Sequence, residues 1–397
     1  MAANREAKNI EPEDLEEEAP RVKPKKTVTP ADLAKLYDDT SGRILQERND
    51  FFLPQIRDFV VKKRWVNLRP EYQRRRRWDQ KKQSKLIESL LMNVPVPPIF
   101  LYETDLSRYE VMDGQQRLVS IIEFYEGKLE LRNLTAWSDL NGLRYSDLPD
   151  RLKRGLDRRR ISSVILLAES AQPEEISFDI RREVFERLNT GGTALNPQEL
   201  RNSIYGGTFN ALIVDLARTP LFCKMWDIPS HGPNPSASKL EQLQSNELYR
   251  KMADCQIVLR FFALREREFV KGSVKNMLDS CMERNQNSDA SALKRFREIF
   301  TSRLKLVHEV FGIDAFRLPA SQNARHSRPL ADALMIALDR LWESAPKLKS
   351  RRPKLKAQLE ALLANPKRYA VIVGRPNTAD AVLRRIALLE SAFRAVL

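Results

Sequence analysis

The chain has 397 residues, of which 68 are Lys or Arg and 53 are Asp or Glu, giving a formal net charge of +15 at neutral pH. With 42% hydrophobic and 30% charged residues, it is predicted to fold into two or three globular domains. No apolar run approaches the roughly 20 residues that a bilayer requires, and the N-terminus has no apolar signal-peptide core, so we expect a cytoplasmic protein without a membrane span.

The cysteine pattern and the excess of basic residues limit the kinds of site and partner that the sequence predicts. Cys223, Cys255 and Cys281 are widely spaced without a CxxC motif, which predicts reduced structural thiols rather than disulfides or a zinc site. The basic excess indicates nucleic acid or nucleotide phosphates as partners, although dispersed and solvated basic faces are also common in intracellular proteins.

Three regions follow from the order of the sequence patterns. Residues 1–40 are predicted to be a disordered charged tail, because an acidic cluster is followed by a patch rich in Pro and Lys. Residues 41–207 alternate strand and helix patterns, which predicts an α/β or α+β unit with a small sheet. Residues 208–397 are predicted to form a helical domain.

The expected elements are a helix over 81–92, strands at 99–102 and 109–111, and a helix after residue 114. A second, weaker sheet region is expected over 129–145 and 161–166, with a helical pattern at 148–160 between its parts. The helices expected after residue 207 cover 209–217, 242–269, 274–285, 292–310, 330–344, 354–364 and 378–396.

A dense basic block over residues 69–79 admits two interpretations. Arg75 to Arg77 form a phosphate-contacting patch for DNA in the first, with Tyr72 or Trp78 stacking on bases. In the second, the block is an exposed loop in which Trp78 packs into the core and one arginine faces a ligand. The sequence favours neither.

The stretch YEVMDGQQR, residues 109–117, is the strongest candidate for a functional site. A strand, a glycine turn and a helix N-terminus make an anion site, because unpaired N–H groups and the positive end of the helix dipole point at one spot. An arginine there can grip phosphate with two parallel donors. The alternative is a surface hairpin turn whose arginine pairs with a neighbouring carboxylate. The candidate residues are Asp113, Gly114, Gln115, Gln116 and Arg117.

A second motif, FERLNTGGTALNPQELRNSIY, spans residues 185–205. As pure structure it predicts a helix, a turn and a second helix that begins at Asn196 and Pro197. The functional interpretation adds a second contact to phosphate or sugar. No Gly-Lys-Ser/Thr follows, so the motif is not a Walker A loop. The residues offered for that contact are Asn189, Thr190, Gly191, Gly192 and Arg201.

Together with YQRRRRW and LIESLLMNVPVPPIFLY, these motifs resemble, in this order, the N-terminal domain family of GmrSD-type, modification-dependent restriction enzymes. That family is related in fold to ParB and sulfiredoxin, and the resemblance covers residues 51–207. It implies an α+β fold with a ParB/sulfiredoxin-like small sheet, followed by a mostly α-helical C-terminal domain. It further implies binding of a nucleoside triphosphate, which studied relatives hydrolyse to control restriction of phage DNA.

The resemblance also implies a set of site residues. Asp113 and Arg117 would be the catalytic pair, with Asp113 holding Mg²⁺ or orienting water, unless Asp113 merely caps the following helix. The implied nucleotide-binding residues are Gln73, Arg74, Asp113, Gly114, Gln115, Gln116, Arg117, Asn189, Thr190 and Gly191.

Two departures limit what is carried over from the family. His231, His308 and His326 do not lie beside the Asn and metal-ligand pattern of an HNH nuclease. We therefore expect no intrinsic HNH cleavage, and any nuclease would be a separate partner subunit. No cysteine lies between residues 108 and 120, which excludes sulfiredoxin redox chemistry.

Three hypotheses remain open at this point. The leading one is a regulatory protein of a prokaryotic DNA restriction or anti-phage defence system that binds and hydrolyses a nucleoside triphosphate and also meets DNA. The second is a ParB-like, metal-dependent DNA nuclease in which Glu88, Glu110 and Asp113 gather the metal ion. The third is a non-enzymatic DNA-binding adaptor.

Overall fold

The computed structural model describes residues 29–30, 34–35, 46–68, 78–167, 184, 187, 196–233, 235–319, 325–374 and 376–397. The described residues fall into two compact units that meet in sequence between Asn196 and Pro197, here called the sheet unit and the helical unit. The predicted α+β class and the helical C-terminal part are confirmed. The predicted domain limits, 1–40, 41–207 and 208–397, stay predictions, because residues 36–45 and most of 168–195 lie outside the described residues.

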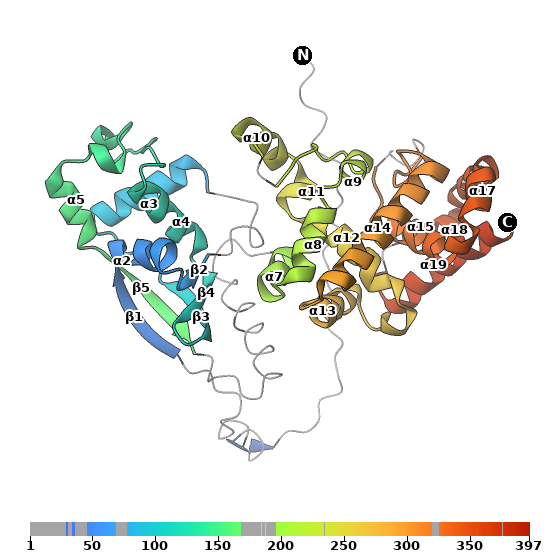
Figure 1. Ribbon diagram of the computed structural model, residues 1–397, viewed down its shortest axis with the longest axis horizontal. Helices are drawn as coiled ribbons and strands as arrows, with labels where there is room; N and C mark the ends of the chain where they lie inside the picture. Colours follow the sequence, from blue (N-terminus) through green and yellow to red (C-terminus); the bar gives the residue numbers. More distant parts are fainter. Residues whose placement is uncertain are drawn as a thin grey trace. The chain divides into compact units, whose positions relative to one another are not determined.

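In the sheet unit, the described strands form one mixed sheet with the order β1-β5-β3-β4-β2 (Figure 1). The pairs β1·β5 and β3·β4 are antiparallel, whereas β3·β5 and β2·β4 are parallel. The strands are β1 Gln46–Phe52, β2 Val66–Asn67, β3 Ile99–Asp105, β4 Arg108–Asp113 and β5 Arg160–Leu166.

The register of the β3–β4 hairpin decides where the candidate turn lies. Leu101 is opposite Val111, and Phe100 is opposite Asp113. Asp113 therefore ends β4 beside the beginning of β3, where the chain turns into the next helix. Val66 pairs with Tyr109 at the far edge of the sheet, so the short segment that precedes the basic block lies beside this hairpin.

Helices pack on one another and on the sheet to form the core of the sheet unit. Figure 1 shows them gathered on one side of the sheet. The helix predicted over 81–92 is confirmed, and it starts where the Asp79 side chain accepts a hydrogen bond from the Lys82 backbone N–H at 2.8 Å. The helices are α2 Leu53–Arg57, the π-helix η2 Asp58–Lys62, α3 Gln80–Leu91, α4 Gln115–Tyr125 and α5 Asp150–Asp157.

The apolar face of each helix explains this packing. Leu86 and Ile87 of α3 and Leu118 of α4 join Ile99 and Ile165 of the sheet in one buried cluster. A fully buried Leu or Ile side chain stabilises the fold by about 1.5–3 kcal/mol. The helical spacing predicted for α3 and α4 therefore marks the faces that are buried in this cluster.

The expected second sheet region is wrong over residues 129–145. That stretch contains no strand; instead it holds the 3₁₀ helices η3 Ser138–Leu140 and η4 Tyr145–Asp147. Leu129, Leu131 and Leu134 reach the core individually from a loop. Only β5, the segment expected at 161–166, is a strand, and it joins the same sheet as β3.

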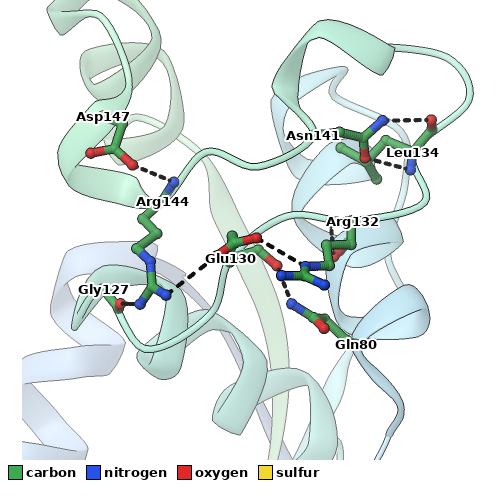
Figure 2. Close-up of polar contacts among 9 residues, drawn as sticks. Gln80, Gly127, Glu130, Arg132, Leu134, Asn141, Arg144 and Asp147 are labelled. Carbon is green, nitrogen blue, oxygen red and sulfur yellow. Dashed lines mark hydrogen bonds and ion pairs between the residues drawn. The ribbon is translucent and has the colours of Figure 1, made fainter.

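Side-chain hydrogen bonds hold this loop in place of a sheet ladder (Figure 2). Glu130 accepts hydrogen bonds from Arg132 at 2.9 Å and from Arg144 at 3.3 Å, and the hydrogen bond from Arg132 is the main reason that the pKa of Glu130 is lowered. The Asn141 side chain pairs with both the N–H and the carbonyl of Leu134, at 2.9 and 3.1 Å. Leu134 thus has both its backbone groups paired without a neighbouring strand, and the backbone of Leu131 bonds to Gly142 and Leu143 of the same loop.

The described part of the helical unit runs from α7 to α19. The prediction of one continuous helix over 242–269 is wrong, because Asn246 is extended and Met252 has a left-handed φ of 54°. These two residues divide the stretch into α10, α11 and α12. The helices are α7 Pro197–Ile204, α8 Thr208–Leu216, α9 Pro220–Met225, α10 Ala237–Ser245, α11 Glu247–Arg250, α12 Ala253–Arg265, η7 Arg267–Phe269, α13 Val274–Asn285, α14 Ala290–Phe311, α15 Arg328–Arg340, η9 Trp342–Ser344, α16 Ala345–Ser350, α17 Arg352–Ala364, α18 Pro366–Val373 and α19 Ala379–Arg394.

The three cysteines lie in the helical unit. Cys223, Cys255 and Cys281 are all buried there as thiols. Burial raises the pKa of Cys281 to about 12, so this thiol stays protonated at neutral pH. None of the described helices combines the length and the apolar character needed to cross a bilayer.

Candidate functional site

The turn between β4 and α4 depends on Gly114. Its φ is +96°, in the left-handed region, and it is the N-cap of α4. A Cβ atom at this position would lie 2.6 Å from Cγ2 of Ile99 on β3. Both the backbone conformation and the close approach of Ile99 therefore require glycine here. The predicted order of strand, glycine turn and helix is confirmed.

Arg117 and Asp113 form an ion pair across the first turn of α4. Nη2 of Arg117 lies 2.8 Å from Oδ2 of Asp113 and also donates to the carbonyl of Pro98 at 3.0 Å. The Arg117 side chain is 13% exposed, whereas that of Asp113 is 42% exposed. The carbonyl of Pro98 thus helps to fix the mostly buried Arg117 guanidinium, whereas the Asp113 carboxylate to which it bonds is partly exposed to solvent.

This pairing decides between the predicted alternatives for the two side chains. Asp113 does not cap α4, since the N-cap is Gly114 and the helix has no side-chain cap. The alternative in which the arginine pairs with a neighbouring carboxylate is correct about the contact, but the turn joins a strand to a helix rather than two strands. Nε of Arg117 is buried and has no hydrogen-bond partner among the described residues.

Gln115 and Gln116 hold the two ends of the basic block. Nε2 of Gln115 donates to the carbonyl of Leu68 at 2.7 Å. Oε1 of Gln116 accepts a hydrogen bond from the backbone N–H of Trp78 at 2.9 Å. Leu68 and Trp78 directly flank residues 69–77, so consecutive amides at the start of α4 fix both ends of the arginine-rich segment next to the turn.

Trp78 packs against the hydrophobic core of the sheet unit, as the second interpretation of the basic block predicted. Sequence reasoning did not find the partners Leu68 and Pro98, because each acts through a backbone carbonyl that any residue could supply. The candidate residues Gln73, Arg74, Asn189, Thr190 and Gly191, together with Tyr72, Arg75 to Arg77 and Gly192, lie outside the described residues.

Arg201 is not a phosphate ligand, contrary to the functional interpretation of the second motif. It lies in α7, which starts at Pro197 as predicted. Its side chain is 2% exposed and its Nε is 2.7 Å from Oδ1 of Asp279 on α13. A buried guanidinium that already has a carboxylate partner has no access to a ligand in solvent, and removing either partner would leave an uncompensated buried charge.

The acidic residues considered for a metal site do not gather. Within the ranges that the structure describes, no group of three or more His, Cys, Asp or Glu side chains is placed to hold a metal ion. Glu88 instead accepts a hydrogen bond from the Trp137 backbone at 2.9 Å, and Glu110 is buried at 9% exposure in β4. Glu88, Glu110 and Asp113 therefore do not form a three-carboxylate centre.

The start of α4 thus combines a glycine turn, the Asp113–Arg117 ion pair and two amide contacts to the backbone. Residues 56–206 match the family model of the GmrSD restriction endonuclease, N-terminal domain. The resemblance predicted from the motifs is confirmed over this GmrSD-like segment. The matched segment includes β2 to β5, the turn with Asp113 to Arg117 and the basic block. A search of curated proteins and a search of solved structures each found no match.

Proposed function

We propose that the turn formed by Asp113 to Arg117 binds the phosphates of a nucleoside triphosphate, in a component of a prokaryotic DNA restriction or anti-phage defence system. The observation that carries this proposal is the pair of amide contacts at the start of α4. Gln115 and Gln116 bring both ends of residues 69–77 to a helix N-terminus that has no side-chain cap. An arginine-rich segment is thereby tied to a turn suited to anions.

We infer that two sources of positive charge serve this turn. The N-terminus of α4 carries the positive end of the helix dipole, and residues Arg74 to Arg77 belong to the segment whose ends are fixed beside it. Gly114 supplies the left-handed φ that turns the chain from β4 into the N-terminus of α4. Phosphates that carry several negative charges are the natural ligand of such a concentration of donors.

Asp113 suits a role with Mg²⁺. The ion prefers oxygen ligands and usually takes only one or two protein carboxylates together with phosphates and water. The Asp113 side chain is 42% exposed, and Arg117 bonds to its Oδ2. Bound Mg²⁺ would neutralise charge on the phosphate oxygens. Arg117 would orient the Asp113 carboxylate for the metal or for the attacking water, which makes hydrolysis the activity to test.

The wider assignment rests on the family match and the net charge. The matched family is named for a restriction endonuclease, and the chain carries a formal charge of +15. We infer that DNA and a separate nuclease subunit are its macromolecular partners, and that nucleotide turnover regulates them. Asn189, Thr190 and Gly191 remain proposed contributors to the same pocket, with Gln73 and Arg74 facing the turn.

Calorimetric titration with each of the four ribonucleoside triphosphates and Mg²⁺ tests this function, followed by phosphate release with and without DNA. Arg117→Ala should weaken binding by about 10-fold or more, the effect of losing one charge-assisted interaction. Arg132→Ala is the matched control, since Arg132 is exposed and bonds to Glu130 in the loop of Figure 2.

Two other results would favour the competing hypotheses. Metal-dependent nicking of DNA that is lost in Asp113→Ala would favour a nuclease. Salt-sensitive DNA binding that persists in Arg117→Ala, in a protein that binds none of the four nucleotides, would favour a DNA-binding adaptor.

A further inference from the structure

An apolar cavity of about 180 Å³ lies within the sheet unit, between the sheet and the α2–η2 segment. The turn at Asp113 to Arg117 does not use it. Its walls come from β1, α2, η2, β2, β3, β4, β5 and α4, so every layer of the unit contributes a side chain. A cavity built from so many elements is held open by the fold as a whole.

Aromatic rings form one wall of this cavity. Phe59 stacks on Trp65 with ring centroids 5.4 Å apart and an interplanar angle of 24°. Phe51 meets Phe59 edge to face, with centroids 5.4 Å apart and an angle of 90°. All three rings line the cavity and are half-buried. They present both ring faces and ring edges to an occupant, the arrangement in which aromatic groups attract one another.

The cavity has buried apolar walls and polar lining residues at its rim. Ile99 and Leu118, each 0% exposed, belong to the buried walls. Ser107, at the turn of the β3–β4 hairpin, and Asn49 on β1 are exposed lining residues, and Tyr109 is half-buried. Ser107 and Tyr109 therefore give the cavity a polar rim at the hairpin, which we call its open end.

Tyr109 can act there as a hydrogen-bond donor. Burial, and secondarily the nearby Glu103 carboxylate, raises the pKa of Tyr109, so the phenol is protonated at neutral pH. Its ring belongs to the side chains packed against the core, which keeps the hydroxyl in a defined position.

We propose that this cavity binds a small molecule that has a single aromatic ring and one hydrogen-bonding substituent, of which phenol is the simplest example. An engineered apolar cavity of about 150 Å³ lined by Leu, Ile and Phe binds benzene, so the volume suits one ring. The three aromatic side chains would contact the ring, and Tyr109, whose side chain is hydrogen-bonded to that of Ser107, would meet the substituent at the open end.

This site is distinct from the proposed nucleotide site. Ile99 separates the two, since it lines the cavity and also packs against Gly114 of the turn. A ring inside the cavity would therefore lie behind the turn and not on its phosphate-facing side. The inference does not rest on nucleotide binding, and its test contains no nucleotide.

Ligand-observed NMR and calorimetry on the full chain, with phenol and benzene as probes, test the site. Val60 lines the cavity and is half-buried, so Val60→Phe should fill it and weaken binding of both probes at least about 10-fold. Val94→Phe is the matched control, because Val94 is 46% exposed and does not line the cavity. This control should bind both probes as the wild type does.

A second variant covers the case in which Val60→Phe does not fold. Tyr109→Phe removes only the hydroxyl, and it should weaken phenol about 5-fold while benzene is unaffected, as expected for one lost hydrogen bond. Three results would each overturn the proposal: no binding of either probe to the wild type up to about 10 mM, equal binding to the wild type and a folded Val60→Phe protein, or unchanged phenol binding in Tyr109→Phe.

Discussion

The side-chain oxygen Oε1 of Gln116 accepts a hydrogen bond from the backbone N–H of Trp78 across 2.9 Å. The neighbouring Gln115 donates to the carbonyl of Leu68 across 2.7 Å, at the other end of the same arginine-rich segment. A glutamine pair in a motif suggests ligand contacts, but here both amides bind backbone groups. They tie Leu68 and Trp78, the residues next to the two ends of residues 69–77, to the start of α4, so we regard them as positioning residues for the proposed site.

Replacing Gln116 by Leu should leave the backbone N–H of Trp78 without its acceptor. This amide should then exchange its proton with solvent more readily, because a local opening no longer has to break the hydrogen bond. We expect the Trp78 amide to exchange several-fold faster than in the wild type, as followed by hydrogen–deuterium exchange with NMR detection.

Gln83→Leu is the control for this experiment. Its side chain donates to Glu123 at 2.8 Å, between α3 and α4, and is also half-buried, and it is not the acceptor of the Trp78 N–H. Equal exchange rates of the Trp78 amide in Gln116→Leu and Gln83→Leu would show that the contact with Gln116 does not protect this amide.

Gly114→Ala should destabilise the sheet unit more than Gly127→Ala does. Both glycines have positive φ, +96° and +70°, so each substitution incurs a left-handed backbone cost of about 1–2 kcal/mol. Only at Gly114 would the new Cβ also meet Ile99, at 2.6 Å, whereas nothing lies within 4 Å of it at Gly127. Overpacking of that kind adds about 1–3 kcal/mol.

Urea denaturation of the two variants measures this difference directly. Because both carry the same chemical change at a positive φ, the excess loss in Gly114→Ala isolates the contact with Ile99. If the two variants unfold at the same urea concentration, the close approach of Ile99 to the turn is not a constraint on residue 114.

Arg201→Met should destabilise the helical unit by about 3–5 kcal/mol, because Asp279 would stay buried without its guanidinium partner. The double variant Arg201→Met with Asp279→Leu should recover part of that loss, since the uncompensated carboxylate is removed as well. Calorimetric unfolding of Arg201→Met, Asp279→Leu and the double variant gives the coupling free energy between the two residues. An Arg201→Met protein as stable as the wild type would contradict a structural role for the pair.

The helical unit should lose stability as the pH falls from about 6.5 to about 4. Burial lowers the pKa of His326 from 6.5 to about 4, so between these values the unfolded chain binds a proton that the folded chain does not. The contribution is therefore present in full above pH 6.5 and declines below it, by at most about 3 kcal/mol for a shift of this size. Nε2 of His326 lies 3.0 Å from the carbonyl oxygen of Met225.

Urea denaturation at several pH values compares the wild type with His326→Gln. The variant should lose part of the dependence between pH 6.5 and pH 4, because Gln does not titrate. The same slope in both proteins would mean that His326 is not protonated on unfolding in this range.

Local signals let the sequence by itself determine much of this protein. Asp79 as a helix N-cap, Gly114 between strand and helix, and Pro197 at a helix start all act within a few residues of the chain. Their effect depends on backbone conformation and short hydrogen bonds, which sequence spacing fixes. The motif order likewise predicted the family resemblance that covers residues 56–206.

Only the tertiary structure decided which partner each polar side chain bonds to. Gln115 bonds to Leu68, 47 residues away, and Arg201 bonds to Asp279, 78 residues away. The tertiary structure also places β1 beside β5. It shows that the apolar stretch after residue 128 is a loop and not a second sheet. Burial and long-range pairing depend on which segments the fold brings together. The spacing of residues along the chain does not specify contacts between segments that are far apart in sequence.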